Sequence, residues 1–73
     1  MSMNKAQQLA AGLALIGEFT TSASFYNSTG GDAIFALSRT LTGAEQVILQ
    51  GLGFVEYYES PVETRISFGE WRT

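Results

Sequence analysis

The feature that most constrains folding is the absence of both cysteine and histidine from a chain of 73 residues. Without them the chain lacks disulfides and the usual zinc ligands, which stabilise many domains of this size. A chain this short buries only roughly 60–65% of the surface that its unfolded form exposes. Hydrophobic residues nevertheless make up 45% of the sequence, too many for a disordered segment. We therefore expect a single domain over residues 1–73, with a thin apolar core that favours a homodimer or small oligomer.

The same absence limits the chemistry that the chain can perform. Ser-His-Asp and Cys-His nucleophilic sites and thiol redox chemistry all need residues that are missing. Seven carboxylates remain, but four of them gather at positions 56, 59, 63 and 70, where a solvated strand surface is the ordinary explanation. We therefore expect no enzyme activity, no catalytic residue, no cofactor and no metal site.

Charge gives little support to nucleic-acid or membrane binding. The net charge is -3, and the basic residues Lys5, Arg39, Arg65 and Arg72 are scattered along the chain rather than clustered. The apolar run over residues 9–17 is far shorter than the roughly 20 residues of a membrane-spanning helix. The sequence therefore predicts a soluble, cytoplasmic protein that contacts neither membranes nor, directly, nucleic acids.

Helical periodicity marks the first element, over residues 4–19. Leu9, Leu13 and Ile16 recur on one face, and Asn4 precedes Gln7 by three residues, as in a capping box. The opposite side carries three small residues, Ala10, Ala14 and Gly17. Small residues allow a second backbone to approach closely. This side is therefore expected to pack tightly inside the domain or to form an oligomer contact between two copies.

The next segment reads as a hairpin. Residues 23–27 are expected to form a short strand and residues 28–31 a turn, because Gly30, Gly31 and Asp32 break any regular element. The return over residues 33–38 suits a buried strand, which we favour. A short helix over residues 33–39, capped by Asp32, is the alternative.

The second helix has the clearest signals in the chain. Thr42 and Glu45 form a capping box, the helix runs through Leu52, and Gly53 is suited to the left-handed conformation that ends helices. Three apolar residues are assigned to its inner face: Val47, Ile48 and Leu52.

The C-terminal segment predicts a second hairpin, with strands over residues 55–60 and 64–70. Period-two alternation points one set of side chains towards the core, namely Val55, Tyr57, Ile66 and Phe68. The other face then carries Glu56, Tyr58, Arg65, Ser67 and Trp71. The predicted fold class is α+β, with two helices covering one face of an antiparallel sheet.

The outer face of this hairpin is the candidate binding surface, because Tyr, Trp and Arg dominate binding hot spots. The candidate partner-binding residues are Glu56, Tyr58, Glu63, Trp71 and Arg72. The leading hypothesis is a non-enzymatic protein-interaction module, for example a small regulator or inhibitor of phage type that occupies a partner's surface. The alternative is a winged-helix-like DNA-binding regulator acting as a dimer, because the helix that starts at Thr42 and the hairpin after it have the order of a recognition helix and a wing. A helix over residues 33–39 would add the preceding helix of a helix-turn-helix. A structural assembly subunit is the third reading.

Overall fold

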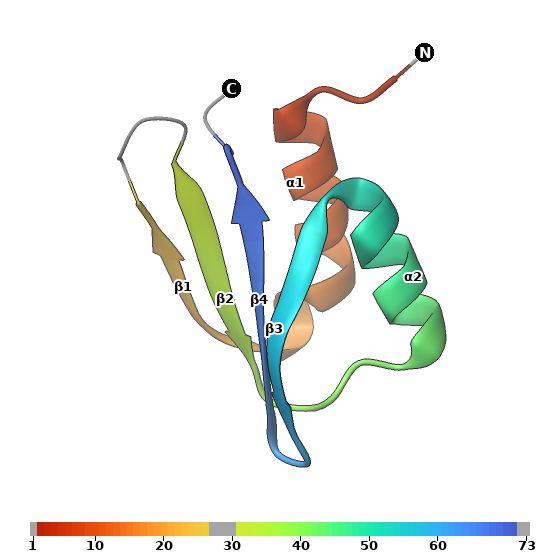
Figure 1. Ribbon diagram of the computed structural model, residues 1–73, viewed down its shortest axis with the longest axis vertical. Coiled ribbons are helices and arrows are strands. Elements are labelled where there is room, and N and C mark those ends of the chain that lie inside the picture. Colours follow the sequence, from red (N-terminus) through yellow and green to blue (C-terminus); the bar gives the residue numbers. More distant parts are fainter. Residues whose placement is uncertain (1, 27–30, 72–73) are drawn as a thin grey trace.

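The computed structural model describes residues 2–26 and 31–71. Its elements, in chain order, are α1 (Lys5–Ile16), a 3-10 turn η1 (Gly17–Phe19), β1 (Thr20–Phe25), β2 (Asp32–Leu37), α2 (Gly43–Leu52), β3 (Phe54–Ser60) and β4 (Glu63–Gly69). The strands form one antiparallel sheet in the order β1-β2-β4-β3. Both helices lie on one side of this sheet, and its other face is open (Figure 1). The predicted α+β fold is thus confirmed.

Both helices begin at the capping boxes that the sequence predicts. Asn4 Oδ1 accepts a hydrogen bond from the Gln7 backbone N–H, while Gln7 Oε1 accepts one from the Asn4 N–H, at 2.8 and 2.9 Å. Thr42 and Glu45 form the same reciprocal pair at the start of α2. These pairs satisfy N–H groups that have no partner inside the helix. Gly53 ends α2 with a φ of 104°, a conformation that a residue with a Cβ rarely adopts.

The strand interpretation of residues 33–38 is confirmed, since β2 covers Asp32–Leu37. It pairs with β1 on one side and β4 on the other, so both of its edges are hydrogen-bonded. Three alternate side chains on its helix-facing side are fully buried, Ala33, Phe35 and Leu37. β1 begins at Thr20, earlier than expected, and most of the predicted turn lies outside the described residues.

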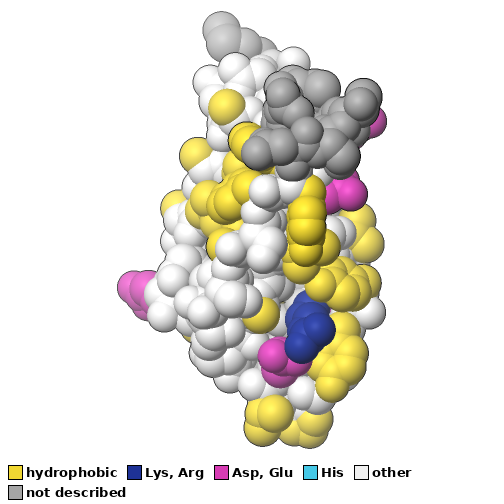
Figure 2. All heavy atoms as spheres, turned by 90° about the vertical axis from the view of Figure 1, so that its left-hand side faces the viewer, with side chains coloured by type: hydrophobic (Ala, Val, Ile, Leu, Met, Phe, Trp, Pro, Cys, Tyr) yellow, Lys and Arg dark blue, Asp and Glu magenta, His cyan; other side chains and the backbone are white. Residues whose placement is uncertain are grey.

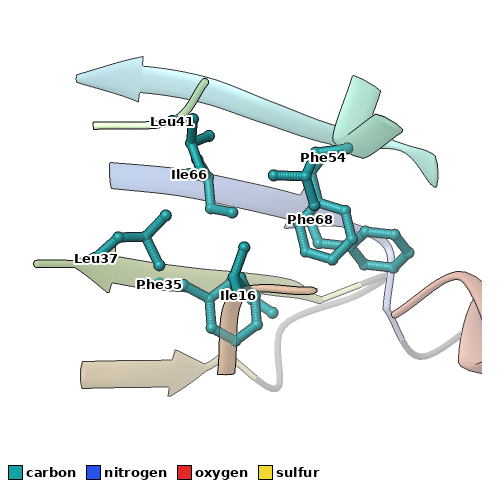
Figure 3. Close-up of a cluster of buried hydrophobic side chains, with 9 residues drawn as sticks. Ile16, Phe35, Leu37, Leu41, Phe54, Ile66 and Phe68 are labelled. Carbon is teal, nitrogen blue, oxygen red and sulfur yellow. The ribbon is translucent and has the colours of Figure 1, made fainter. Parts of the chain in front are cut away.

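The core lies between the helices and the sheet. Its buried side chains include Ile16, Phe35, Leu37, Leu41, Phe54, Ile66 and Phe68 (Figure 3). The rings of Phe54 and Phe68 have their centroids 4.8 Å apart. Gly12 lets α1 approach these rings closely, because a Cβ at this position would stand 2.2 Å from Phe54 Cε1. The small residue that matters for packing α1 is therefore Gly12, which lies beside the core.

The predicted inner face of α2 is wrong at Val47 and Ile48 and right at Leu52. Val47 is 70% exposed and Ile48 is 51% exposed, whereas Leu49 is almost fully buried and Leu52 packs partly against the core. Apolar residues at 47, 48, 49 and 52 span more of the helix surface than one sheet contact can cover. The docking of α2 on the sheet turns the stripe formed by Leu49 and Leu52 towards the core.

A charged cluster fixes the link between β2 and α2. Arg39 donates through Nη1 and Nη2 to the two carboxylate oxygens of Glu45, at 2.9 and 2.8 Å. Its guanidinium carbon also lies 3.7 Å from the centroid of the Phe19 ring. These hydrogen bonds, with that from the Thr42 N–H, lower the pKa of Glu45 to about 2. The start of α2 is thereby tied to the residues that precede β1.

Candidate functional site: the two sides of strand β3

A β-bulge in β3 decides which side chains reach each side of the sheet. Glu56 pairs with Ile66 and Tyr58 with Arg65, so Tyr57 between them has no partner in the ladder. Directly paired residues point to the same face of a sheet. Glu56 therefore points to the helix side with Ile66, while Tyr58 points to the open side with Arg65. Such an extra residue interrupts the period-two alternation of a strand.

On the open side, the bulge and the hairpin bring three side chains together. Arg65 Nε donates to Glu63 Oε1 at 3.1 Å, and the Arg65 guanidinium carbon lies 5.5 Å from the centroid of the Tyr58 ring. Tyr58 is 48% exposed, and Val55 on the same side is 59% exposed. We call Val55, Tyr58, Glu63 and Arg65 the open-face cluster.

This cluster continues onto the neighbouring strand β2. Ile34 and Ala36 point to the same open side, because they pair with Ser67 and Arg65 of β4. Both are half-buried. Seen from the side away from the helices, hydrophobic side chains gather around basic and acidic side chains that lie against one another (Figure 2). A surface of this composition resembles the mixed aromatic, aliphatic and charged make-up of protein interfaces.

On the helix side, Glu56 lines a pocket of about 410 Å³ between α2 and β3. Its Oε2 atom is buried and has no hydrogen-bond partner within residues 2–26 and 31–71. Burial raises the pKa of the Glu56 carboxyl above its ordinary value, and the neighbouring Glu59 carboxyl acts in the same direction through charge repulsion and through a side-chain hydrogen bond. Glu59 shares this side because it pairs with the fully buried Thr64.

The structure places the predicted site residues on two sides of the sheet instead of one. Tyr58 and Glu63 lie together on the open side, as predicted. Glu56 was assigned to that side, but it points towards the helices. Trp71 packs against the core, meets the Phe25 ring edge-on at 5.3 Å and donates from Nε1 to the Tyr26 carbonyl. Arg72 lies outside the described residues.

Two hairpin residues that the sequence analysis placed in the core are exposed in the structure. Val55 lies in the open-face cluster, and Tyr57 is 51% exposed. Strict alternation from Val55 onwards cannot anticipate a bulge, and Phe54, which is buried opposite Phe68, begins the inward set one residue earlier. Arg65 was placed on the correct face of the sheet by the sequence analysis but was not named as a binding residue. Its position two residues after Glu63 was the available signal, since such residues share a face of a strand.

The predicted oligomer contact lies on the surface of the molecule. Ala10, Ala14 and Gly17 are all exposed, and Gly17 is the residue at which α1 gives way to the 3-10 turn. Ala10 also lines a shallow groove with Ala6, Leu9, Leu13 and Trp71. Self-association through this side stays a prediction.

Within the described part of the chain, no set of three or more Asp or Glu side chains is placed to hold a metal ion. Neither described helix combines the length and apolar character needed to cross a membrane. No family model, curated protein or solved structure matches the chain.

Proposed function

We propose that this protein is a non-enzymatic protein-interaction module that binds its partner through the open-face cluster. The observation that carries this proposal is the arrangement of Tyr58, Arg65 and Glu63. A half-exposed tyrosine lies under a guanidinium that is itself hydrogen-bonded to a carboxylate. Because these side chains are already in contact in the free protein, binding orders fewer rotamers than it would on a loop.

The composition of the surface supports a protein partner more than a nucleic acid. The open-face cluster combines one basic residue with one acidic residue, so it offers no net positive charge to phosphates. A helix directly before α2 would strengthen the winged-helix-like alternative, but residues 32–37 form a strand in the middle of the sheet. A small regulator or inhibitor that occupies a partner's surface remains the specific form of the proposal.

The test uses three forms of the full chain as bait in the source lysate: wild type, Tyr58→Ser and Val47→Ser. Val47 is the matched control, since it is an exposed apolar residue on α2, on the other side of the sheet. Proteins retained by wild type and Val47→Ser but lost with Tyr58→Ser are purified, and their affinities are measured by calorimetry. Tyr58→Ser should weaken binding about tenfold or more, the effect of losing a hot-spot side chain.

Two outcomes would contradict the proposal. The first is a purified partner that binds wild type and Tyr58→Ser with equal affinity. The second is tight binding of duplex DNA with an affinity that falls steeply as salt is raised, which is the signature of phosphate contacts and would support the DNA-binding alternative.

A further inference from the structure

The pocket between α2 and β3 combines apolar walls with a carboxylate. Leu41, Leu49, Phe54 and Ile66 supply the apolar lining, and Gln46, Gln50 and Glu56 supply the polar groups. Ligand pockets in proteins have this composition, in which a few polar groups fix the orientation of an otherwise apolar guest. The pocket opens beside the edge strand β3, whose other side carries the open-face cluster.

The polar groups of this pocket favour a cation. Glu56 Oε2 is buried without a hydrogen-bond partner among the described residues, and the Glu59 carboxyl lies close enough to raise the pKa of Glu56. A carboxylate oxygen that is shielded from water without a hydrogen-bond partner is unfavourable, and a second carboxylate beside it adds repulsion when both groups are charged. A positive charge placed in the pocket would relieve both effects.

The described basic residues of this chain have contacts elsewhere. Lys5 Nζ lies 5.4 Å from the centroid of the Phe68 ring, Arg39 binds Glu45, and Arg65 binds Glu63. The bulge explains why the two carboxylates come together. Regular alternation would put residues 56 and 59 on opposite sides of the strand, and the bulge puts them on the same side. The positive charge that complements them is therefore best supplied from outside.

We propose that the α2–β3 pocket receives a lysine or arginine side chain of the protein partner. Its alkyl stem packs against the apolar lining around Leu49 and Phe54, and its charged head group donates hydrogen bonds to Glu56 and Glu59. Basic side chains commonly bury their stems on apolar surface in this way. This inference rests on the proposed function, because it assigns part of the same partner to the helix side of β3.

Small analogues of these side chains test the pocket without the partner. The ¹⁵N-labelled full chain is titrated with n-butylguanidinium, n-butylammonium and the neutral isostere n-butylurea at matched ionic strength and pH 7. Both cations should shift the amide signals of Leu49, Glu56 and Ile66, with dissociation constants of roughly 1–10 mM for ligands this small. The neutral compound should bind at least tenfold more weakly.

Two variants sharpen this titration. Glu56→Gln should reduce cation affinity at least tenfold, whereas Glu18→Gln should leave it unchanged. Glu18 is an exposed residue of η1, so the control removes one negative charge without touching the pocket. In wild type, a saturating cation should also lower the pKa of Glu56, followed by ¹³C signals of the carboxyl carbon, because a bound cation favours the charged form.

Equal binding of n-butylurea, unchanged affinity in Glu56→Gln, or no shifts in these amides would each overturn the inference. The proposed function can fail separately. Tyr58→Ser should bind the small cations as wild type does, so loss of partner binding in that variant reports on the open-face cluster alone. Partner binding that depends on Tyr58 while the pocket ignores cations would sink only the inference about the pocket.

Discussion

Among the described residues, the two edge strands of the sheet, β1 and β3, each have one side without a strand partner, but they differ in almost everything else. β1 reads TTSASF, carries no charge, and is exposed at every residue after Thr20. β3 starts with a buried phenylalanine and bulges at Tyr57. It sends Glu56 and Glu59 to the helix side, and Val55 and Tyr58 to the open side. Unpaired edges invite association, and charges and bulges are common protection against it. The comparison indicates that β3 carries side chains that can select a binding partner. β1 carries no such groups and is held mainly by its pairing with β2.

The largest expected difference concerns the phenylalanine of each edge. Phe54 is fully buried, while Phe25 is 46% exposed although it contacts Phe35 and Trp71. Phe54→Ala should lower the free energy of unfolding by about 3–5 kcal/mol, and Phe25→Ala by roughly half of that or less. Urea denaturation measures both values.

A loss of this size approaches the whole stability of such a domain, about 4–11 kcal/mol, so Phe54→Leu is measured as well. It should fold and still lose more stability than Phe25→Leu. Equal losses of stability at the two positions would mean that the two edge strands depend equally on their phenylalanines.

A second comparison tests how β1 is held. The Tyr26 N–H donates to the Asp32 carbonyl at 2.8 Å, and hydrogen-bonded pairs alternate along an antiparallel ladder. The Ser24 N–H therefore faces β2, and the Ala23 N–H faces away from it. Ser24→Pro should lower the free energy of unfolding by about 1–3 kcal/mol through the lost ladder bond, and Ala23→Pro by less.

Thermal melts of the two proline variants provide the measurement, with Ala23→Ser and Ser24→Ala as controls for the side chains. If Ala23→Pro is the more damaging change, β1 pairs with β2 in the opposite phase.

A third prediction concerns the carboxyl on the helix side of β3. Because burial raises the pKa of folded Glu56 above its unfolded value, the folded state is favoured when this group is protonated. Its contribution to stability is fully present below the unfolded pKa and is lost as pH rises through the folded pKa. Glu56→Gln should therefore raise the melting temperature at pH 7, and this gain should disappear in acid.

Glu45 provides the control of opposite sign, because its pKa is lowered to about 2 by Arg39 and Thr42. Glu45→Gln should lower the melting temperature at pH 7, and the difference should shrink as pH falls from about 4.5 towards 2. A loss of stability in Glu56→Gln at pH 7 would show that its carboxylate is favourably paired.

The smallest expected effects are those of the adjacent tyrosines. Tyr57 and Tyr58 are about half exposed, so Tyr57→Ala and Tyr58→Ala should each lower the free energy of unfolding by about 1 kcal/mol or less. If Tyr57 lay in the core, as the alternation pattern of the sequence predicts, Tyr57→Ala would lower the free energy of unfolding by about 3 kcal/mol or more. Urea denaturation of both variants decides between the two values.

The residues whose roles were correctly predicted are those with local signals. The capping pairs Asn4–Gln7 and Thr42–Glu45 and the left-handed Gly53 depend on contacts within a few residues. In β4, which pairs on both sides, alternation held, so Ile66 and Phe68 point into the core as expected. In β3 the same rule failed at Val55, Glu56 and Tyr57, because the bulge exists only where β3 pairs with β4.

By itself the sequence determined the order of helices and strands, the starts of both helices, the end of α2 and the lack of histidine and cysteine chemistry. These follow from residue type and from hydrogen bonds between close neighbours in the chain. Only the tertiary structure decided that Leu49 rather than Val47 faces the sheet, and that Glu56 and Tyr58 lie on opposite sides of it. The physical reason is that docking of a helix and the register of an edge strand depend on partners distant in sequence, whose packing overrides local periodicity.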